Sequence, residues 1–360
     1  MKIIIDARMI IDRLHGIARV LLETLKVFRE KEIPHEISLL TNNKKYLKDL
    51  DLIPYFNAIT VKSTPFSPGE FLEIPSVLRK TKADLYHAAS ISVPLQEVMP
   101  TVVTILDLIP LHSGKIFHKI YCKTVLRNAA RYSRKIIAIS QFTKRDIVEN
   151  LGCDPEKIVV TYLAAAAGPD KKKSWDEIKE KFGIEKPFLF CLANPKPHKN
   201  LKGLIDIYDL IREKRQGKVL LVIGSKSSDE LNEKINNSSY NNDIIRIDYI
   251  DELELDALYA NTDVFVYTSY FEGFGLPPLE AMMRGAAVVS SPRTSLSEIV
   301  GDGGMQVDPD EKEKFADSVI KFLDNENIRR EYGKRALEQA SKFSWERCAL
   351  ETLKVYESAI

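Results

Sequence analysis

One stretch of the chain, residues 269–289, constrains the fold more than any other part of the sequence. An apolar run over 263–267 precedes it, and a second apolar run over 286–289 ends it. Between them, Leu276 to Arg284 has the signals of a helix, with prolines in its first turn and Gly285 after its last residue. Short apolar runs of this kind are typical of buried parallel strands. The stretch therefore predicts a strand, a glycine-bearing loop, a helix and a second strand.

The loop of this unit suits a phosphate ligand. Its N–H groups and the positive end of the helix point the same way, and Gly273 and Gly275 let a ligand approach the backbone. Glu272 and Glu280 flank the loop, and a carboxylate would repel a diphosphate but can accept hydrogen bonds from a vicinal diol. The residue types thus indicate a ligand with both phosphate and sugar hydroxyls. Spacing alone leaves a plainer interpretation open, in which Glu280 complements the helix dipole and Glu272 is a solvated loop residue.

Residues 271–282, Phe-Glu-Gly-Phe-Gly-Leu-Pro-Pro-Leu-Glu-Ala-Met, resemble the Glu-x7-Glu signature of retaining glycosyltransferases of family 4. The resemblance extends from the first strand to the last helix. It implies an α/β architecture, the GT-B fold, in which two Rossmann-like domains with doubly wound parallel sheets face each other across a cleft. We expect an N-terminal acceptor domain over 1–165, a nucleotide-sugar domain over 174–342, and a helix over 343–360 that crosses back to the first domain.

The general properties of the sequence agree with this class. A chain of 360 residues exceeds one ordinary core, and alternating strand and helix patterns predict doubly wound sheets. The net charge of +1 and the lack of a recognised motif argue against nucleic acid as a partner. Four scattered cysteines fit a reducing cytoplasm, and they favour neither a zinc cluster nor a disulfide framework. No run has the length of a signal peptide or a transmembrane helix, so we expect a cytoplasmic protein.

The first group of donor-binding residues lies in loops that precede predicted helices. Lys199 stands immediately before a helix that Asn200 is expected to cap, and both its charge and the helix dipole suit a phosphate. The resemblance implies the same role for Lys199, and it places Gly16 near the donor phosphates. Asn194 stands in the neighbourhood where relatives often have an arginine, and Lys196 or His198 is a candidate for the missing donor capacity. A solvated lysine and a simple turn glycine are the plainer interpretations of Lys199 and Gly16.

The resemblance implies the remaining donor contacts in the second domain. The strand ends at Gly224 and Ile250 would border the nucleotide, whose base is read mostly by backbone groups. Glu280 would bind the ribose hydroxyls, and Glu272 would hold the donor sugar and stabilise an electron-poor anomeric carbon. The central loop would bind the diphosphate through four residues, Gly273, Phe274, Gly275 and Leu276.

The chain departs from the family pattern most clearly at Leu106. The segment from Val103 to Leu111 resembles a family segment that usually contains His-Asp, and that histidine would contact the donor sugar. Asp107 remains, and we expect it to orient a sugar hydroxyl or the acceptor. The leucine leaves an alternative open, in which the chain is an inactive GT-B subunit that binds nucleotide or a partner transferase.

A basic row precedes the second half of the first domain. From Leu108 to Arg145 the sequence contains no Asp or Glu, and basic residues recur at every fourth position: Lys115, Lys119, Lys123, Arg127, Arg131 and Lys135. On one helix these residues would form a slowly winding stripe, with apolar surface from Phe117, Ile120, Tyr121, Val125 and Ala129 beside it. Like charges at this spacing repel, so Lys119, Lys123, Arg127 and Arg131 are expected to meet an anionic membrane surface or a lipid-diphosphate acceptor. A solvated face is the plainer alternative.

The resemblance implies transfer of a hexose from a nucleoside diphosphate sugar, with retention and with no required cofactor or metal. The acceptor would be a glycan or a polyprenyl-diphosphate-linked glycan of surface-polysaccharide or lipopolysaccharide assembly, and the protein would be peripheral on the inner face of the membrane. The loop over 194–200 is similar to that of bacterial mannosyl- and rhamnosyltransferases, which favours GDP-mannose. UDP-glucose or a related donor stays open, as does another GT-B reaction such as epimerisation or phosphorolysis.

Overall fold

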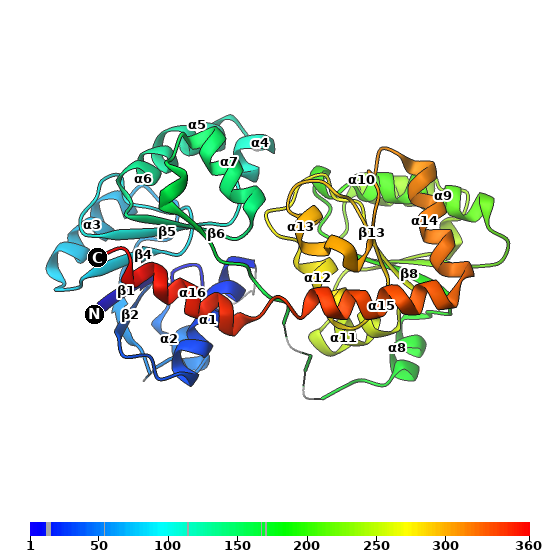
Figure 1. Ribbon diagram of the computed structural model, residues 1–360, viewed down its shortest axis with the longest axis horizontal. Coiled ribbons are helices and arrows are strands. Elements are labelled where there is room, and N and C mark those ends of the chain that lie inside the picture. The colour runs from blue at the N-terminus through cyan, green and yellow to red at the C-terminus, as the bar shows by residue number, and fades with distance from the viewer. Residues whose placement is uncertain (12–15, 54, 114, 167, 170) are drawn as a thin grey trace. The chain divides into compact units, whose positions relative to one another are not determined.

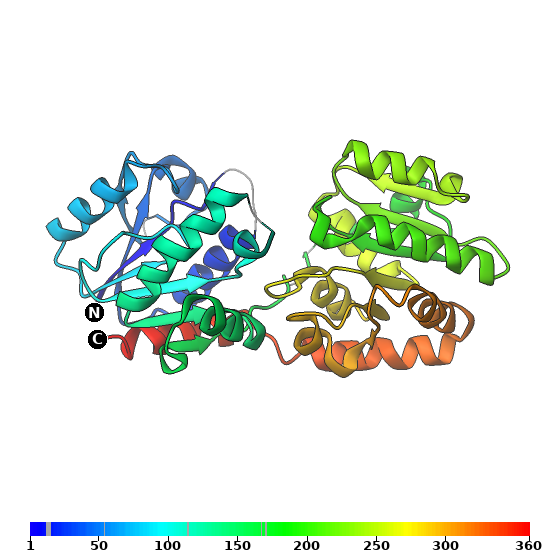
Figure 2. The same ribbon diagram turned by 90° about the horizontal axis from the view of Figure 1, so that it is seen from above.

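The computed structural model describes residues 1–11, 16–53, 55–113, 115–166, 168–169 and 171–360 (Figure 1). It divides into two compact units. Unit 1 comprises Met1–Leu163 and Ser344–Ile360, and unit 2 comprises Ala164–Phe343. Figure 2 shows that each unit is a sheet with helices on both of its faces, which confirms the predicted doubly wound architecture.

Strands and helices alternate along much of unit 1, except where two strands or several helices follow one another, and a C-terminal helix ends the unit. Its described strands are β1 (Lys2–Asp6), β2 (Glu36–Thr41), β3 (Asn57–Thr60), β4 (Leu85–Ala88), β5 (Thr101–Ile105), β6 (Lys135–Ala138) and β7 (Ile158–Val160). Its described helices are α1 (Gly16–Glu30), α2 (Lys44–Asp49), α3 (Glu70–Lys80), α4 (Ile109–Ser113), α5 (Ile116–Tyr121), α6 (Arg127–Tyr132), α7 (Gln141–Leu151) and α16 (Trp345–Glu357). A π-helical turn, Cys122–Leu126, joins α5 to α6.

Unit 2 begins with a helix and then alternates in the same way. Its described strands are β8 (Phe188–Leu192), β9 (Leu220–Gly224), β10 (Ile244–Ile247), β11 (Val264–Tyr267), β12 (Val288–Ser290) and β13 (Met305–Gln306). Its described helices are α8 (Trp175–Phe182), α9 (Leu201–Lys214), α10 (Asp229–Asn236), α11 (Glu252–Asn261), α12 (Leu276–Met283), α13 (Leu296–Val300), α14 (Lys312–Asp324) and α15 (Glu326–Ala340).

The core of unit 1 has two layers because successive side chains of a strand point to opposite faces. Along β1, Ile3 and Ile5 are buried in the layer that α1 and α16 cover. Ile4 is buried in the opposite layer, which α3 and α7 cover. All three successive isoleucines are therefore buried, as expected for a parallel strand that is covered on both faces.

Helix α2 is short, spanning Lys44–Asp49. The side chain of Asn43 caps its start by accepting a hydrogen bond from the Tyr46 N–H at 3.1 Å. Asp51 has a φ of 53°, a left-handed conformation that an α-helix does not accommodate, so the chain leaves the helix before this residue.

The strand order identifies where each unit binds ligands. Within the described residues the orders are β3-β2-β1-β4-β5-β6-β7 and β10-β9-β8-β11-β12-β13, and the paired strands run parallel. The chain reverses its direction across the sheet between β1 and β4, and again between β8 and β11. Open α/β sheets bind ligands outside the carboxyl ends of the strands at such a switch point. The loops after these four strands are therefore the candidates for a site.

The C-terminal helix α16 is fixed to unit 1 through a buried histidine. Tyr356 lies 2.7 Å from Nδ1 of His87, and Nε2 of His87 lies 2.8 Å from the Thr104 hydroxyl. A neutral imidazole has one N–H and one lone pair, which suffices because both hydroxyls can donate or accept. Burial lowers the pKa of His87 from 6.5 to about 3, so the ring is neutral in the folded protein.

We expect His87 to make the folded state sensitive to acid. Because its pKa is lower when folded than when unfolded, its contribution to stability is complete above pH 6.5 and is lost as the pH falls towards 3. The loss is about 1.4 kcal/mol per pH unit, or roughly 2 kcal/mol between pH 6.5 and 5. Urea unfolding of His87→Gln at pH 7 and pH 5 should show a smaller decrease in unfolding free energy than wild type. An exposed-site control, His118→Gln, should keep the wild-type decrease, and an unchanged decrease in His87→Gln would contradict the assignment.

Candidate functional site

The switch point of unit 2 brings together Lys199 and Glu272, the two charged residues that the sequence analysis singled out. Lys199 lies in the loop that follows β8, and Glu272 lies in the loop that follows β11. The Lys199 Nζ is 2.6 and 2.7 Å from the two carboxylate oxygens of Glu272. Glu272 is 6% exposed, so this ion pair is largely removed from water. The two strand ends thus place a cation and a carboxylate in contact, 73 residues apart in sequence.

Hydrogen bonds join the two loops that carry this pair. The carbonyl oxygen of His198 accepts a bond from the Tyr270 N–H at 2.7 Å and another from the Ser269 hydroxyl at 3.1 Å. The Thr268 hydroxyl donates to the Asn200 carbonyl oxygen at 3.1 Å. Lys199 is therefore flanked on both sides by residues that the β11 loop holds.

A third loop fixes the backbone of Glu272. The Thr294 hydroxyl accepts a hydrogen bond from the Glu272 N–H at 3.0 Å, and the Ser295 hydroxyl lies 2.9 and 2.8 Å from the carbonyl oxygens of Glu272 and Phe274. Thr294 has a φ of 60°, a conformation that is strained for a β-branched residue. Strain of this kind persists only where its surroundings over-determine the position, and here the residue supports a carboxylate at a switch point.

The glycine loop leads into α12 as the sequence predicted. Gly275 has a φ of 111°, and a Cβ atom on it would lie 2.7 Å from Leu296, so only glycine fits. Helix α12 begins at Leu276, and the N–H groups of its first turn have no partners within the helix. Gly275 and Leu276 therefore lie at a helix N-terminus, an arrangement that favours an anion, and Gly273 precedes them in the same loop. Phe274 is buried with its ring edge-on to Phe343, so its side chain belongs to the core.

The second carboxylate of the motif is also buried and also meets a tyrosine. Glu280 is 5% exposed on α12, and the hydroxyl of Tyr259 donates a hydrogen bond to its Oε2 at 3.0 Å. Tyr267 has the same relation to Glu272, where its hydroxyl donates to Oε1 at 2.7 Å. Burial raises the pKa of both phenols well above 10, so both remain protonated donors. Glu272 is therefore not the solvated loop residue of the plainer interpretation.

The other donor-binding candidates have more ordinary surroundings. A Cβ atom on Gly224 would lie 2.7 Å from Leu192 and 2.8 Å from Ile250, so close packing explains this glycine without a ligand. Ile250 contributes its side chain to that packing. Asn194 is exposed, and its carbonyl oxygen accepts a hydrogen bond from the Lys196 N–H at 2.8 Å. The roles proposed for these three residues stay predictions.

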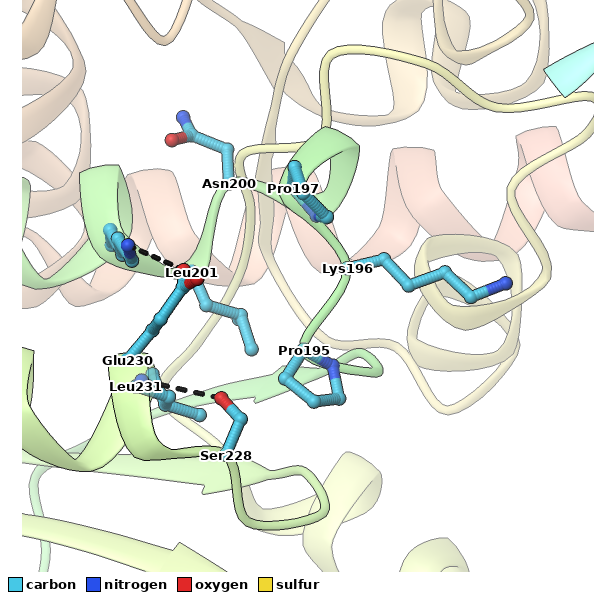
Figure 3. Close-up of a pocket in the computed structure, with 9 residues that line it drawn as sticks. Pro195, Lys196, Pro197, Asn200, Leu201, Ser228, Glu230 and Leu231 are labelled. Atoms are coloured by element: carbon cyan, nitrogen blue, oxygen red, sulfur yellow. Dashed lines mark hydrogen bonds and ion pairs between the residues drawn. The ribbon is translucent and has the colours of Figure 1, made fainter. Parts of the chain in front are cut away.

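A cavity of about 170 Å³ adjoins the loop that carries Lys199 (Figure 3). Its walls come from the loop over 195–200 and from the first turns of α9 and α10, which Asn200 and Ser228 cap. Lys202 and Glu230 form an ion pair of 2.6 Å at its edge. Lys196 points away from the other lining residues in Figure 3 and is exposed, so it is available beside Lys199 for the donor role considered from the sequence.

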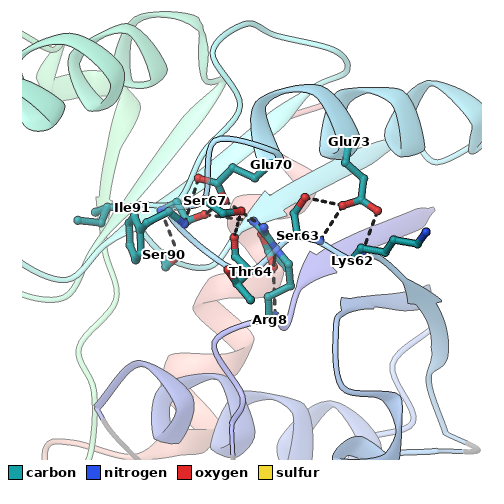
Figure 4. A network of polar contacts seen from close by, with 12 residues as sticks. Arg8, Lys62, Ser63, Thr64, Ser67, Glu70, Glu73, Ser90 and Ile91 are labelled. Atoms are coloured by element: carbon teal, nitrogen blue, oxygen red, sulfur yellow. Dashed lines mark hydrogen bonds and ion pairs between the residues drawn. The ribbon is translucent and has the colours of Figure 1, made fainter.

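The switch point of unit 1 holds a buried charge network that the sequence analysis did not predict (Figure 4). Arg8, which follows β1, is 1% exposed and binds Asp6 at 2.7 Å and Glu70 at 3.0 Å. The Ser92 hydroxyl donates to Glu70 at 2.5 Å, and Tyr86 donates to Asp6 at 2.9 Å. Burial raises the pKa of Glu70, although Ser92 and Arg8 oppose the increase. Only the position of Asp6 and Arg8 at a strand end hinted at this network, because Glu70 and Ser92 come from distant segments.

Two further predicted residues of unit 1 lie at helix starts. Gly16 is the exposed first residue of α1. Asp107 follows β5, and its Oδ1 accepts a hydrogen bond from the Ile109 N–H at 2.9 Å, which fixes the start of α4. Leu106 lines a cavity of about 20 Å³ with apolar neighbours that include Ile17 and Leu163. The catalytic role predicted for Asp107 stays a prediction.

The helix that carries the basic row is shorter than the row, which corrects the sequence prediction at its two ends: Lys115 precedes α5, and Lys135 lies in β6. Between them, α5, the π-helical turn Cys122–Leu126 and α6 follow one another without a break, and the wider π turn shifts where the later residues face. Lys123, Arg127 and Arg131 are nevertheless exposed, and Lys119 is partly exposed. Lys135 lies in β6, where its Nζ donates to the Glu156 carbonyl oxygen at 3.2 Å, so it is not part of this surface.

The apolar residues near the row also differ from the expectation. Ala129 is buried in the core, and the Tyr121 hydroxyl donates to the Ile91 carbonyl oxygen at 2.9 Å. Phe117 and Ile120 do form apolar surface on α5, at 58% and 55% exposed, and Ile116, at 73%, adds to it. Helix α5 therefore combines exposed apolar side chains with lysines at 115 and 119.

The part of the chain that the structure describes contains neither a membrane-spanning helix nor a metal-binding cluster. No helix there combines the length and the apolar character needed to cross a membrane. In the same part of the chain, no group of three or more His, Cys, Asp or Glu side chains is arranged to hold a metal ion.

Comparisons with known proteins agree with the two-unit division. Residues 14–164 match the family model described as Glycosyltransferase Family 4, and residues 174–339 match the model described as Glycosyl transferases group 1. O-antigen chain mannosyltransferase B of Escherichia coli is 29% identical over 290 residues, which cover 78% of this chain and 76% of that protein. The serotype-specific mannosyltransferase WbdA of Escherichia coli is 30% identical over 272 residues, 71% of this chain, and the match spans 33% of WbdA.

Solved structures share the fold. HepE of Anabaena in complex with UDP and glucose aligns with a TM-score of 0.78 at 19% identity, covering 99% of this chain and 100% of that one. A glycosyltransferase of Rickettsia africae aligns with a TM-score of 0.74 at 16% identity, covering 99% of this chain and 98% of that one. Similarity at this level of identity concerns the fold. With the family models matched in both units, the chain is an enzyme of the glycosyltransferases with the GT-B fold and belongs to glycosyltransferase family 4.

Proposed function

We propose that this glycosyltransferase moves a mannosyl group from GDP-mannose to a lipid-linked glycan of surface-polysaccharide assembly, with retention at the anomeric carbon. The observation that carries the proposal is the buried pair of Lys199 and Glu272 beside the N-terminus of α12. It places a cation, a carboxylate and the N-terminus of a helix at one switch point, which are the groups that suit a sugar diphosphate.

Each group of this site has a defined task in the proposal. Lys199 and the N–H groups over 273–276 would bind the diphosphate and stabilise the charge that develops as it leaves. Glu280 would accept hydrogen bonds from the ribose hydroxyls, and Glu272 would hold the sugar and stabilise its electron-poor anomeric carbon. The positive charge at the leaving group thus comes from protein groups, and the proposal requires no metal or cofactor.

The names of the relatives support mannose as the transferred sugar. O-antigen chain mannosyltransferase B and WbdA both match most of this chain, and the match covers three quarters of the former. The runner-up donor is UDP-glucose, because HepE, which shares the fold, was solved with that nucleotide sugar.

The surface of α5 supports a membrane-bound acceptor. Its exposed Ile116, Phe117 and Ile120 lie beside lysines, and the basic row continues through Lys123, Arg127 and Arg131. Interfacial helices combine an apolar face that enters the lipid boundary with cations that attract anionic headgroups. We propose that this surface holds unit 1 at the inner face of the membrane, near a polyprenyl-diphosphate-linked acceptor.

Nucleotide binding tests the donor site directly. A ligand that binds the folded state raises its apparent stability, by about 2.7 kcal/mol when present at 100 times its Kd. In a thermal-shift panel, GDP and GDP-mannose should raise the Tm by roughly 5 °C, more than UDP and UDP-glucose do. Lys199→Ala should lose the shift, and the neighbouring control Lys202→Ala should keep it. A larger shift with UDP-sugars would identify a UDP-sugar as the donor in place of GDP-mannose. No shift with any nucleotide would refute the site.

Product analysis tests the reaction. Wild-type protein with GDP-mannose and a polyprenyl-diphosphate-linked glycan should give a product with the α-configuration of the donor. Glu272→Gln should lower kcat by roughly 100- to 1,000-fold, the loss seen when one group that stabilises transition-state charge is removed. A β-linked product would refute retention, and full activity of Glu272→Gln would refute the role of this carboxylate.

Vesicle flotation tests the membrane surface. The protein should float with phosphatidylcholine vesicles that contain phosphatidylglycerol and much less with pure phosphatidylcholine. The combined variant Lys123→Glu, Arg127→Glu and Arg131→Glu should bind at least about 100-fold more weakly, since each cation near an anionic surface contributes about 1 kcal/mol. A control with the same change in net charge, Lys44→Glu, Lys45→Glu and Lys48→Glu on α2, should bind like wild type. Equal flotation of the two variants would contradict the assigned surface.

A further inference from the structure

Glu272 and the diphosphate of the donor would compete for the ammonium group of Lys199. Both carboxylate oxygens of Glu272 contact the Lys199 ammonium, at 2.6 and 2.7 Å, in the unliganded protein. The Lys199 side chain is 14% exposed, so little of its charge faces water. Under the proposed function, the same ammonium must bind the diphosphate of the donor. The donor therefore has to draw Lys199 away from a carboxylate that already holds it.

Glu272 would then be a buried carboxylate without its cation. Burying an ion without a partner is costly, whereas hydrogen bonds to a charged group are strong. The Tyr267 hydroxyl already donates to Oε1 at 2.7 Å, and it comes from β11, an interior strand of the sheet, so it does not depend on the ligand. Tyr267 is 1% exposed, and its ring is stacked with that of Phe265, 6.0 Å between centroids. The Tyr267 hydroxyl is thus a fixed donor to Glu272, whose other partner, Lys199, would be needed by the diphosphate.

We propose that Tyr267 is a positioning residue of the transfer site, holding Glu272 in place when the donor diphosphate draws Lys199 away. This inference rests on the proposed function of the site. In the unliganded state Lys199 and Tyr267 share the carboxylate, and in the donor complex Tyr267 keeps Oε1 while Oε2 turns to the sugar. Tyr267 matters most after the donor has bound, so its loss should appear in kcat more than in nucleotide affinity.

Tyr259 provides a matched control for this effect. It also donates one phenolic hydrogen bond to a buried carboxylate of the motif, Glu280, and it belongs to the same aromatic cluster, with its ring centroid 5.5 Å from that of Phe265. Tyr259→Phe and Tyr267→Phe each remove one oxygen from this cluster. Because Glu280 is assigned to the ribose, Tyr259→Phe should weaken nucleotide affinity and change kcat less.

The experiment measures steady-state transfer and GDP titration by calorimetry for wild type, Tyr267→Phe, Tyr259→Phe and Glu272→Gln. We expect Tyr267→Phe to lower kcat by about 10- to 100-fold while the Kd for GDP changes less than about threefold, as one hydrogen bond to a charged group is lost. Glu272→Gln should bind GDP several-fold more tightly than wild type, because Lys199 is released. Thermal unfolding of each variant confirms that the fold is retained.

The outcomes separate this inference from the proposed function. A kcat of Tyr267→Phe within twofold of wild type, or the same kcat and Kd changes in both tyrosine variants, would overturn the positioning role. Unchanged or weaker GDP binding by Glu272→Gln would overturn the competition for Lys199, even if wild type transfers sugar. If wild type transfers no sugar but Glu272→Gln binds GDP more tightly, the competition stands and the proposed transfer fails.

Discussion

The contact between Lys199 and Glu272 is the interaction on which the rest of unit 2 depends. Bringing these two charges together out of water costs several kcal/mol per ion, and the structure recovers that cost only through close geometry and further hydrogen bonds. The pairing of β8 with β11 supplies the geometry, since the loops after these strands meet at one edge of the sheet. Tyr267, Thr294 and Ser295 supply the hydrogen bonds, and each fixes a different part of Glu272. Glu272 is thus held from several sides in the unliganded protein.

Unit 1 solves a related problem at its own switch point. There the guanidinium of Arg8 lies between the carboxylates of Asp6 and Glu70 and is buried. The fork of an arginine side chain can bind two carboxylates at once, which a lysine ammonium does less well. This network lies at the carboxyl end of β1, and its charges are paired with one another. The two switch points therefore differ in kind: unit 2 pairs one lysine with one carboxylate, whereas unit 1 pairs one arginine with two.

The sequence predicted the architecture and the central residues of the site because their signals are local. Glu272, Glu280 and the glycine loop lie within one strand–loop–helix unit, and Lys199 directly precedes a capped helix, so short-range rules were sufficient. The partners of these residues could not be predicted in the same way. Tyr267 and Tyr259 have the appearance of core aromatics in any local pattern. Only the folded unit, with Tyr267 at the end of β11 and Tyr259 in α11, brings their hydroxyls to the two carboxylates. Thr294 gave no signal because its role depends on a strained backbone conformation. The basic row was placed on too long a helix, since an even spacing of lysines and arginines does not show that the last of them, Lys135, belongs to a strand.

The leucine at position 106 gains a physical explanation from the structure. Leu106 lines a small cavity of unit 1 whose walls combine apolar side chains such as Ile17 and Leu163 with polar ones such as Thr104 and Thr161. The leucine packs against the apolar part of this lining and offers no hydrogen-bonding group to a ligand. The departure from the family pattern therefore fits its surroundings, and it does not require an inactive unit. Under the proposed function it removes one polar contact to the sugar, so the carboxylate of Glu272 would carry more of the hold on the donor sugar.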